Sequence, residues 1–100
     1  MKMPTILAVQ RATVQLNPGI YVRDLISSDT AHRISHPRQD AMAAAREMGK
    51  LSFPAIARQF GGKHHSTVMH GVNRANKLRP AKVAAIIELA KKIMAKGSTK

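Results

Sequence analysis

Five polar residues follow a glycine pair in the second half of the chain: Lys63, His64, His65, Ser66 and Thr67 come directly after Gly61-Gly62. Imidazole and hydroxyl groups donate and accept hydrogen bonds in fixed directions, and a threonine methyl group adds an apolar contact. These properties match the edges of DNA bases in the major groove, where each base pair presents its own pattern of donors, acceptors and methyl groups. The segment 63–67 is therefore a candidate for contact with base edges.

The same residues are poorly arranged for metal binding or catalysis. His64 and His65 diverge by about 100° on a helix, and neither stands four residues before His70, which is the spacing of a helical zinc pair. The chain has no cysteine, and its five acidic residues are scattered. No paired carboxylates and no nucleophile with a recognisable histidine and acid are visible. We expect no metal, no cofactor and no enzymatic activity.

The glycine pair also differs from the phosphate-binding loop of an ATPase. In that loop the lysine after the last glycine is followed by serine or threonine, whose hydroxyl binds the magnesium ion. In this chain His64 follows Lys63. We therefore expect no nucleotide among the partners.

Positive charge is concentrated in the second half of the chain. The 17 basic and 5 acidic residues give a net charge of +12. Residues 1–49 carry 6 basic and 4 acidic side chains, whereas residues 50–100 carry 11 and 1. A field of this sign attracts polyanions, with nucleic acid first and an anionic membrane surface second. No segment approaches the roughly 20 apolar residues of a membrane span, so we expect a nucleic-acid partner and no membrane partner.

The sequence is typical of a protein of the cytoplasm. The absence of cysteine suits a reducing compartment, and the apolar run Ile6–Val9 near the start is too short for a signal peptide. We expect a cytoplasmic location, in the bacterial nucleoid, or in the host cytoplasm if a phage encodes the protein.

The elements around segment 63–67 predict a helix-turn-helix from Ser52 to about Leu78. Ser52 is a helix cap and Pro54 is tolerated in the first turn of a short helix that the glycine pair ends. The next helix is predicted to run from Lys63 to Leu78. Its expected buried face consists of Val68, Val72 and Ala75. A helix that follows a tight turn and opens on polar residues can place its first turn in the major groove.

Helical patterns also begin and end the chain. The spacing of apolar residues predicts a helix over Thr5–Leu16, which Asn17-Pro18-Gly19 ends, and a last helix over about Pro80–Lys96. Residues 97–100 are predicted to fray.

The segment before the helix-turn-helix is less regular. Residues 20–26 form either a short extended piece or one helical turn, and Ser27–His36 is predicted as a loop. A further helix opens at Ser35 or His36, with Pro37 in its first turn, and ends at Gly49. The chain thus predicts one all-α domain over residues 1–100, with about five helices.

The stretch from Ile20 to about Leu78 resembles the C-terminal DNA-binding domain of DnaA, the bacterial chromosomal replication initiator. The segment from His36 to Ala43 resembles that family's helix opening on Arg-Pro-Arg-Gln. The segment from Ser52 to His70 resembles its signature, a glycine pair followed by a basic residue, Asp, His, Thr, Thr, Val, an aliphatic residue and His. The resemblance implies a compact helical fold of the type shared by Trp repressor and the DnaA C-terminal domain, with double-stranded DNA as partner.

The resemblance also implies roles for single residues. His64, His65 and Ser66 align with residues that meet bases in the major groove, and Lys63 belongs to the same turn. Thr67 and Arg74 align with phosphate contacts. Arg38 and Pro54 stand where the family approaches the DNA backbone.

Two departures from the family pattern bear on specificity. The signature's Asp, an acceptor suited to a cytosine amino group, is His64 in this chain, and a neutral imidazole donates from one nitrogen and accepts at the other. The family also has a basic loop whose arginine enters the minor groove. The aligned residue is Thr30, beside Asp29, so His32 and Arg33 are the substitutes that the sequence offers.

The sequence therefore predicts a duplex DNA-binding regulator of replication or transcription without an ATPase. Two alternatives stay open. The basic second half would serve a sequence-tolerant architectural protein, and the last helix, with its exposed lysines, would serve an adaptor that dimerises or binds a replication protein.

Overall fold

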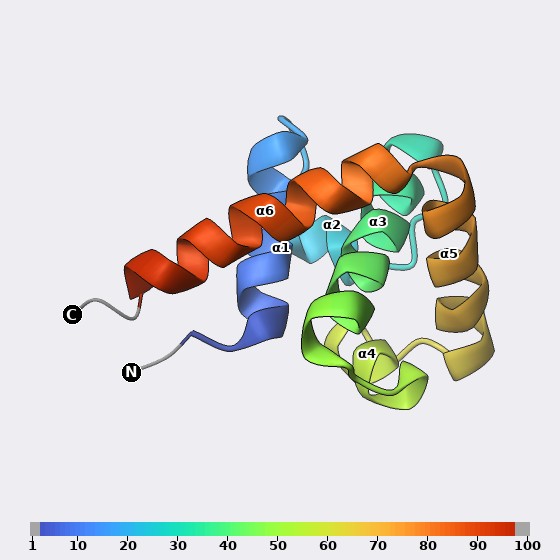
Figure 1. Cartoon of the computed structure of the whole chain (residues 1–100). Coiled ribbons are helices and arrows are strands. Elements are labelled where there is room, and N and C mark those ends of the chain that lie inside the picture. Colours follow the sequence, from blue (N-terminus) through green and yellow to red (C-terminus); the bar gives the residue numbers. More distant parts are fainter. Residues whose placement is uncertain (1–2, 98–100) are drawn as a thin grey trace.

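The computed structural model describes residues 3–97 and contains six helices (Figure 1). They are α1 (Thr5–Leu16), α2 (Val22–Leu25), α3 (His32–Gly49), α4 (Phe53–Gln59), α5 (His65–Leu78) and α6 (Pro80–Gly97). The predicted all-α class is confirmed, and no strand occurs within residues 3–97. Residues 20–26, for which a strand or a helical turn was open, contain α2, and this turn makes six helices in place of about five.

α3 lies at the centre and packs against each of the other helices (Figure 1). Its middle is rich in alanine, and Ala41, Ala43, Ala44 and Ala45 are fully or almost fully buried. Small side chains allow neighbouring helices to come close, because the distance between packed helices depends on the residues at the contact. Gly71 of α5 has the same effect, since a Cβ there would lie 3.1 Å from Cγ of Gln39.

α3 begins earlier than the sequence predicts. The expected opening at Ser35 or His36 is wrong, because the helix starts at His32 and Pro37 lies inside it. The backbone N–H groups of Ile34 and Ser35 donate to the Ala31 carbonyl at 2.9 and 2.8 Å and close the extra turn. Proline removes one bond of the helical ladder, and the helix continues past it. The predicted loop is shortened to residues 26–31.

α6 packs along α1 and α3 and reaches the end of α5 (Figure 1). Its buried face contains Val83, Ile86, Ile87 and Ala90. Leu16 and Leu78, the last residues of α1 and α5, are exposed. Of the predicted frayed end, Gly97 is the last residue of α6, and residues 98–100 lie outside the described residues. Among residues 3–97, no helix has the length and apolar character needed to cross a bilayer.

Candidate nucleic-acid interface

α4 begins as the sequence predicts. The Ser52 hydroxyl accepts a hydrogen bond from the Ala55 N–H at 3.2 Å and caps the helix, and Pro54 occupies its first turn. The other end is anchored in the core, because Ile56 and Phe60 are completely buried. α4 is thereby held against α5, and its exposed Pro54 end points out of the core.

The turn between α4 and α5 depends on two glycines in the left-handed region. Gly61 has φ +90° and Gly62 has φ +75°. A Cβ on Gly61 would lie 2.1 Å from the Ile26 carbonyl oxygen, whereas a Cβ on Gly62 would meet nothing within 4 Å. Gly61 is therefore required by both conformation and contact, and Gly62 by conformation alone.

Lys63 is engaged inside the protein. Its ammonium donates to the carbonyls of Ser27 and Phe60, both at 2.7 Å, and to that of Ile26 at 3.4 Å. Burial lowers the pKa of Lys63 from its ordinary value, and the nearby Arg38 lowers it further. These carbonyls take the donors of the ammonium in the structure, and the contact of Lys63 with bases stays a prediction. Lys63 fastens the turn to the segment after α2.

α5 starts at His65, two residues later than the sequence predicts, and His64 is its cap. Nδ1 of His64 accepts the Ser66 N–H at 3.1 Å and lies 2.7 Å from the Ser66 hydroxyl oxygen. The rings of His64 and His65 stack with centroids 4.5 Å apart. His64, His65 and Thr67 are exposed, and Ser66 is half-buried. The helix thus opens on polar side chains at the surface.

A hollow of about 380 Å³ lies between the starts of α4 and α5. Pro54, His64 and His65 line it, so the structure brings together three residues that the resemblance assigns to DNA contact. Arg58 lines it as well. The position of Arg58 one helical turn after Pro54 is the sequence signal that could have indicated it.

Arg38, in contrast, is directed into the protein. Nε donates to the Leu25 carbonyl at 3.0 Å, and Nη2 donates to the Asp24 carbonyl at 3.0 Å and to the Ser27 hydroxyl at 3.2 Å. The residue is 6% exposed, and burial lowers the pKa of Arg38 from its ordinary value. The guanidinium holds α2 onto α3, and the expected contact between Arg38 and the DNA backbone stays a prediction.

The remaining predicted residues are at the surface. Arg74 is exposed on α5, beside Lys77. His32 and Arg33 are exposed on the first turn of α3 and not on a loop, and they line a hollow of about 410 Å³ with Lys82 of α6. The His32 ring stacks on His36 at 4.7 Å. Their contact with the minor groove stays a prediction.

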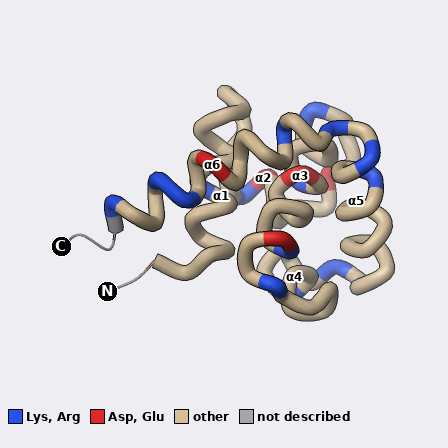
Figure 2. Tube along the Cα trace, in the orientation of Figure 1, with Lys and Arg blue, Asp and Glu red and all other residues tan. Residues whose placement is uncertain are grey.

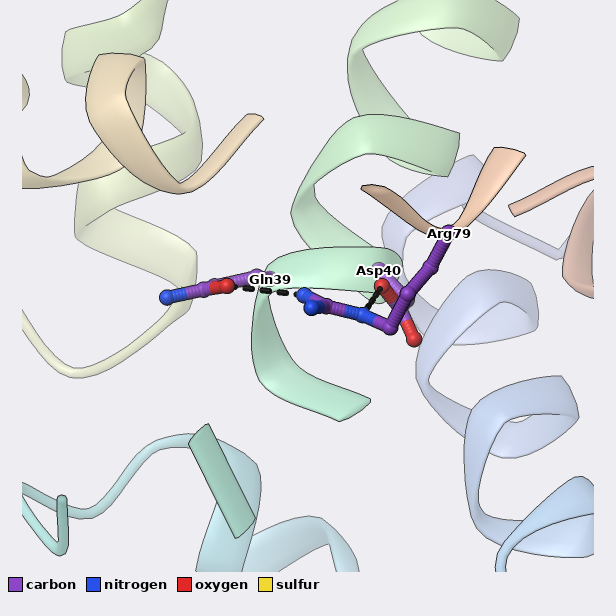
Figure 3. A network of polar contacts seen from close by, with 3 residues as sticks. All are labelled: Gln39, Asp40 and Arg79. Carbon is purple, nitrogen blue, oxygen red and sulfur yellow. Dashed lines mark hydrogen bonds and ion pairs between the residues drawn. The ribbon is translucent and has the colours of Figure 1, made fainter. Parts of the chain in front are cut away.

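A buried network that sequence reasoning missed joins α3 to the connection between α5 and α6 (Figure 3). Nε of Arg79 donates to the Asp40 carboxylate at 2.8 Å, and Nη2 donates to the Gln39 side-chain oxygen at 2.8 Å. Burial raises the pKa of Asp40, and the hydrogen bond from Arg79 opposes that rise. The network fixes the far end of α5. No local pattern indicates it, because its members are 39 and 40 residues apart.

Basic residues gather near the junction of α5 with α6 and at the C-terminal part of α6 (Figure 2). Others lie beside the turn that precedes α5 (Figure 2). Lys and Arg residues therefore lie near both ends of α5, and positive charge so placed attracts a partner with negative charges.

Comparison with known proteins agrees with this geometry. The family model described as the bacterial DnaA protein helix-turn-helix matches residues 9–75. The chromosomal replication initiator protein DnaA of Francisella tularensis subsp. novicida (strain U112) is 48% identical over 60 residues, which are 60% of this chain and 12% of that protein. DnaA of Caulobacter vibrioides (strain NA1000 / CB15N) is 40% identical over 78 residues, or 78% of this chain and 16% of that protein.

The chain thus spans less than a fifth of the length of these relatives. The family match itself extends from α1 to the last turn of α5 and includes the complete turn with its glycine pair. The resemblance predicted from the sequence is confirmed, and the chain belongs to the bacterial DnaA helix-turn-helix family.

Proposed function

We propose that this protein binds double-stranded DNA sequence-specifically, with the start of α5 in the major groove. The observation that carries the proposal is the capped, exposed start of α5, where His64, His65 and Ser66 stand on a turn fixed by Gly61 and Lys63. Membership of the DnaA helix-turn-helix family supports DNA binding. In this proposal Thr67, Arg74 and the N-terminal end of α4 at Pro54 contact phosphates.

The biological role that follows is regulation of replication or transcription in the nucleoid. Binding through these residues needs no ATP hydrolysis, so the protein would occupy a site and compete with or recruit other proteins without melting the duplex. The curated relatives are named as chromosomal replication initiators, which favours replication as the process.

Selection from random duplexes, followed by affinity measurements on the selected site, tests this function. His65→Ala is expected to cost about 1 to 3 kcal/mol on the selected site and little on random DNA. Lys92→Ala, which removes an exposed charge from α6, is the control and should leave the selected site unchanged. Equal losses of affinity on both DNAs would favour the architectural alternative, and no binding to any duplex would favour the adaptor.

A further inference from the structure

We propose that the hydrogen bonds at the start of α5 determine which hydrogen-bonding groups it recognises on DNA bases. In this proposal His64 donates a hydrogen bond to an acceptor on a base. The inference rests on the proposed DNA contact and adds the chemical class of the base. Its starting point is the cap, in which Nδ1 of His64 accepts the Ser66 N–H at 3.1 Å. A ring nitrogen that accepts from an N–H carries no proton, so the neutral ring has its proton on Nε2.

The same nitrogen orients the hydroxyl of Ser66. The Ser66 oxygen lies 2.7 Å from Nδ1 of His64. Because Nδ1 carries no proton in this cap, the hydroxyl is the donor of that contact, and the N–H and O–H of Ser66 share the single lone pair of Nδ1. Its hydrogen is therefore directed to His64, and the oxygen offers only lone pairs to an incoming base. The cap thus gives His64 an outward N–H and gives Ser66 an outward acceptor.

The neighbours of His64 support this orientation. Its ring stacks on His65 with an angle of 26° between the planes, which restrains rotation of the ring about its side-chain bonds. The Lys63 ammonium is held by carbonyls of the preceding segments, so it does not supply an alternative donor at the same place. Nδ1 of His64 is taken by the cap, so Nε2 is the ring nitrogen left for an incoming base.

In the major groove, a donor and an acceptor pair with different sets of bases. An N–H donor pairs with N7 or O6 of guanine, N7 of adenine or O4 of thymine, and it finds no partner on cytosine, whose polar group in the groove is an amino donor. The Ser66 acceptor pairs with the amino group of adenine or cytosine. An aspartate at position 64, as in the resembling family signature, only accepts and therefore demands the opposite class of base.

Two substitutions at position 64 keep the helix cap and differ in the hydrogen-bonding group that faces the DNA. In His64→Asn, the side-chain oxygen can cap α5 and the amide NH₂ remains as an outward donor. In His64→Asp, the carboxylate caps α5 equally well but offers only acceptors. Selection from random duplexes with the full chain and both variants is the experiment. His64→Asn should keep the base chosen by the unsubstituted protein. His64→Asp should change one position of the motif to a base with an amino group, by about 5- to 150-fold in relative affinity.

Circular dichroism melting of both variants confirms that α5 remains capped and the chain folded. The proposal is overturned if the Asn and Asp variants both select the same base among guanine, thymine and cytosine, because the two variants differ in polarity and share the cap. Adenine presents both an acceptor at N7 and an amino donor, so if both variants select adenine, replacing it by 7-deazaadenine must weaken binding of the Asn variant and not of the Asp variant, and any other result overturns the proposal. In that case a selected motif still supports sequence-specific binding by α5. An unsubstituted protein that selects no motif would instead overturn the proposed function, and the assignment at position 64 would fall with it.

Discussion

Two arginines that the resemblance assigns to the DNA backbone have opposite surroundings. Arg38 is 6% exposed and donates to two carbonyls and a hydroxyl of the segment 24–27, whereas Arg74 is exposed on α5. A buried guanidinium that satisfies carbonyls stabilises the fold, because its removal leaves those oxygens without donors. An exposed one remains available to phosphate.

We expect Arg38→Met and Arg74→Ala to have different consequences. Arg38→Met should lower the free energy of unfolding by about 2 to 4 kcal/mol and leave the salt dependence of DNA binding unchanged. Arg74→Ala should leave stability unchanged and flatten the plot of log K against log salt by roughly one unit. Urea unfolding and salt titrations measure the two quantities. A flatter salt plot for a fully stable Arg38→Met variant would show that this guanidinium leaves its carbonyls to reach DNA.

At this scale the sequence identified which residue types can contact bases, but not which of them are engaged inside the protein. His64, His65 and Thr67 are exposed where a helix opening on polar residues predicts them. Lys63 belongs to the same polar run, yet its acceptor at Ser27 is 36 residues away in the chain. The spacing of residues near Lys63 carries no information on a carbonyl so distant in the chain. The acceptors of the Lys63 ammonium could therefore be identified only from the tertiary structure.

At the scale of elements, the turn before α5 is the most constrained connection. Both of its glycines have positive φ, but only Gly61 abuts another backbone, that of Ile26. Gly61→Ala should therefore destabilise the protein well beyond the roughly 1 to 2 kcal/mol that the left-handed conformation alone costs. Gly62→Ala should cost only about that amount, and Gly62→Asn less, since asparagine tolerates this conformation. Urea unfolding of the three variants measures the difference. Equal losses for Gly61→Ala and Gly62→Ala would contradict the contact with Ile26.

The contact between α3 and the α5–α6 junction predicts a pH dependence of stability. The pKa of His36 is lowered from 6.5 by burial first, then by the charges of Arg79, His32 and Arg74, with Asp40 acting in the opposite direction. A lowered folded-state pKa means that the unfolded chain binds the proton more readily. The contribution of His36 is therefore fully present above the unfolded value of 6.5 and is lost as the pH falls through the lowered folded value.

We expect His36→Gln to flatten the stability curve in that window. Urea unfolding of both proteins between about pH 7.5 and pH 5, a window that includes the ordinary pKa of histidine, measures the effect. His70→Gln, which removes an exposed imidazole from α5, is the control for the substitution itself. A His36→Gln protein with the same slope as the unsubstituted protein would show that His36 does not carry the pH dependence.

The opening of α3 shows why element boundaries were harder to predict than elements. A polar residue followed by proline is a frequent helix start, and Ser35, His36 and Pro37 have that pattern. The extra turn before them contains Ile34, which is 2% exposed. Burial of this side chain is a tertiary gain that no local rule registers, and it outweighs the single bond that proline removes. The caps at Ser52 and the glycine pair were predictable because their hydrogen bonds are local.

At the scale of the whole molecule, α3 connects the supports of the candidate interface. Arg38 ties its first half to the segment 24–27, which in turn holds Lys63 and the turn before α5. Asp40 and Gln39 tie it to Arg79 at the other end of α5. Both ends of α5 are thus connected to α3, the start through the segment 24–27 and the end through Arg79. A partner meets a preformed surface and binding costs little ordering of the backbone.

The distribution of charge over this rigid body gives the last prediction. If DNA lies along α5, we expect about 4 to 7 phosphate contacts and a slope of log K against log salt near −4 to −6, at about −0.9 per contact. Two double variants remove the same charge from different places. Arg74→Ala/Lys77→Ala, on α5, should flatten the slope by roughly two units, whereas Lys91→Ala/Lys92→Ala, on α6, should leave it nearly unchanged. Equal effects of the two pairs would mean that the DNA is held by the total charge and not by the surface of α5, and a slope shallower than about −2 for the unsubstituted protein would exclude phosphate-dominated binding altogether.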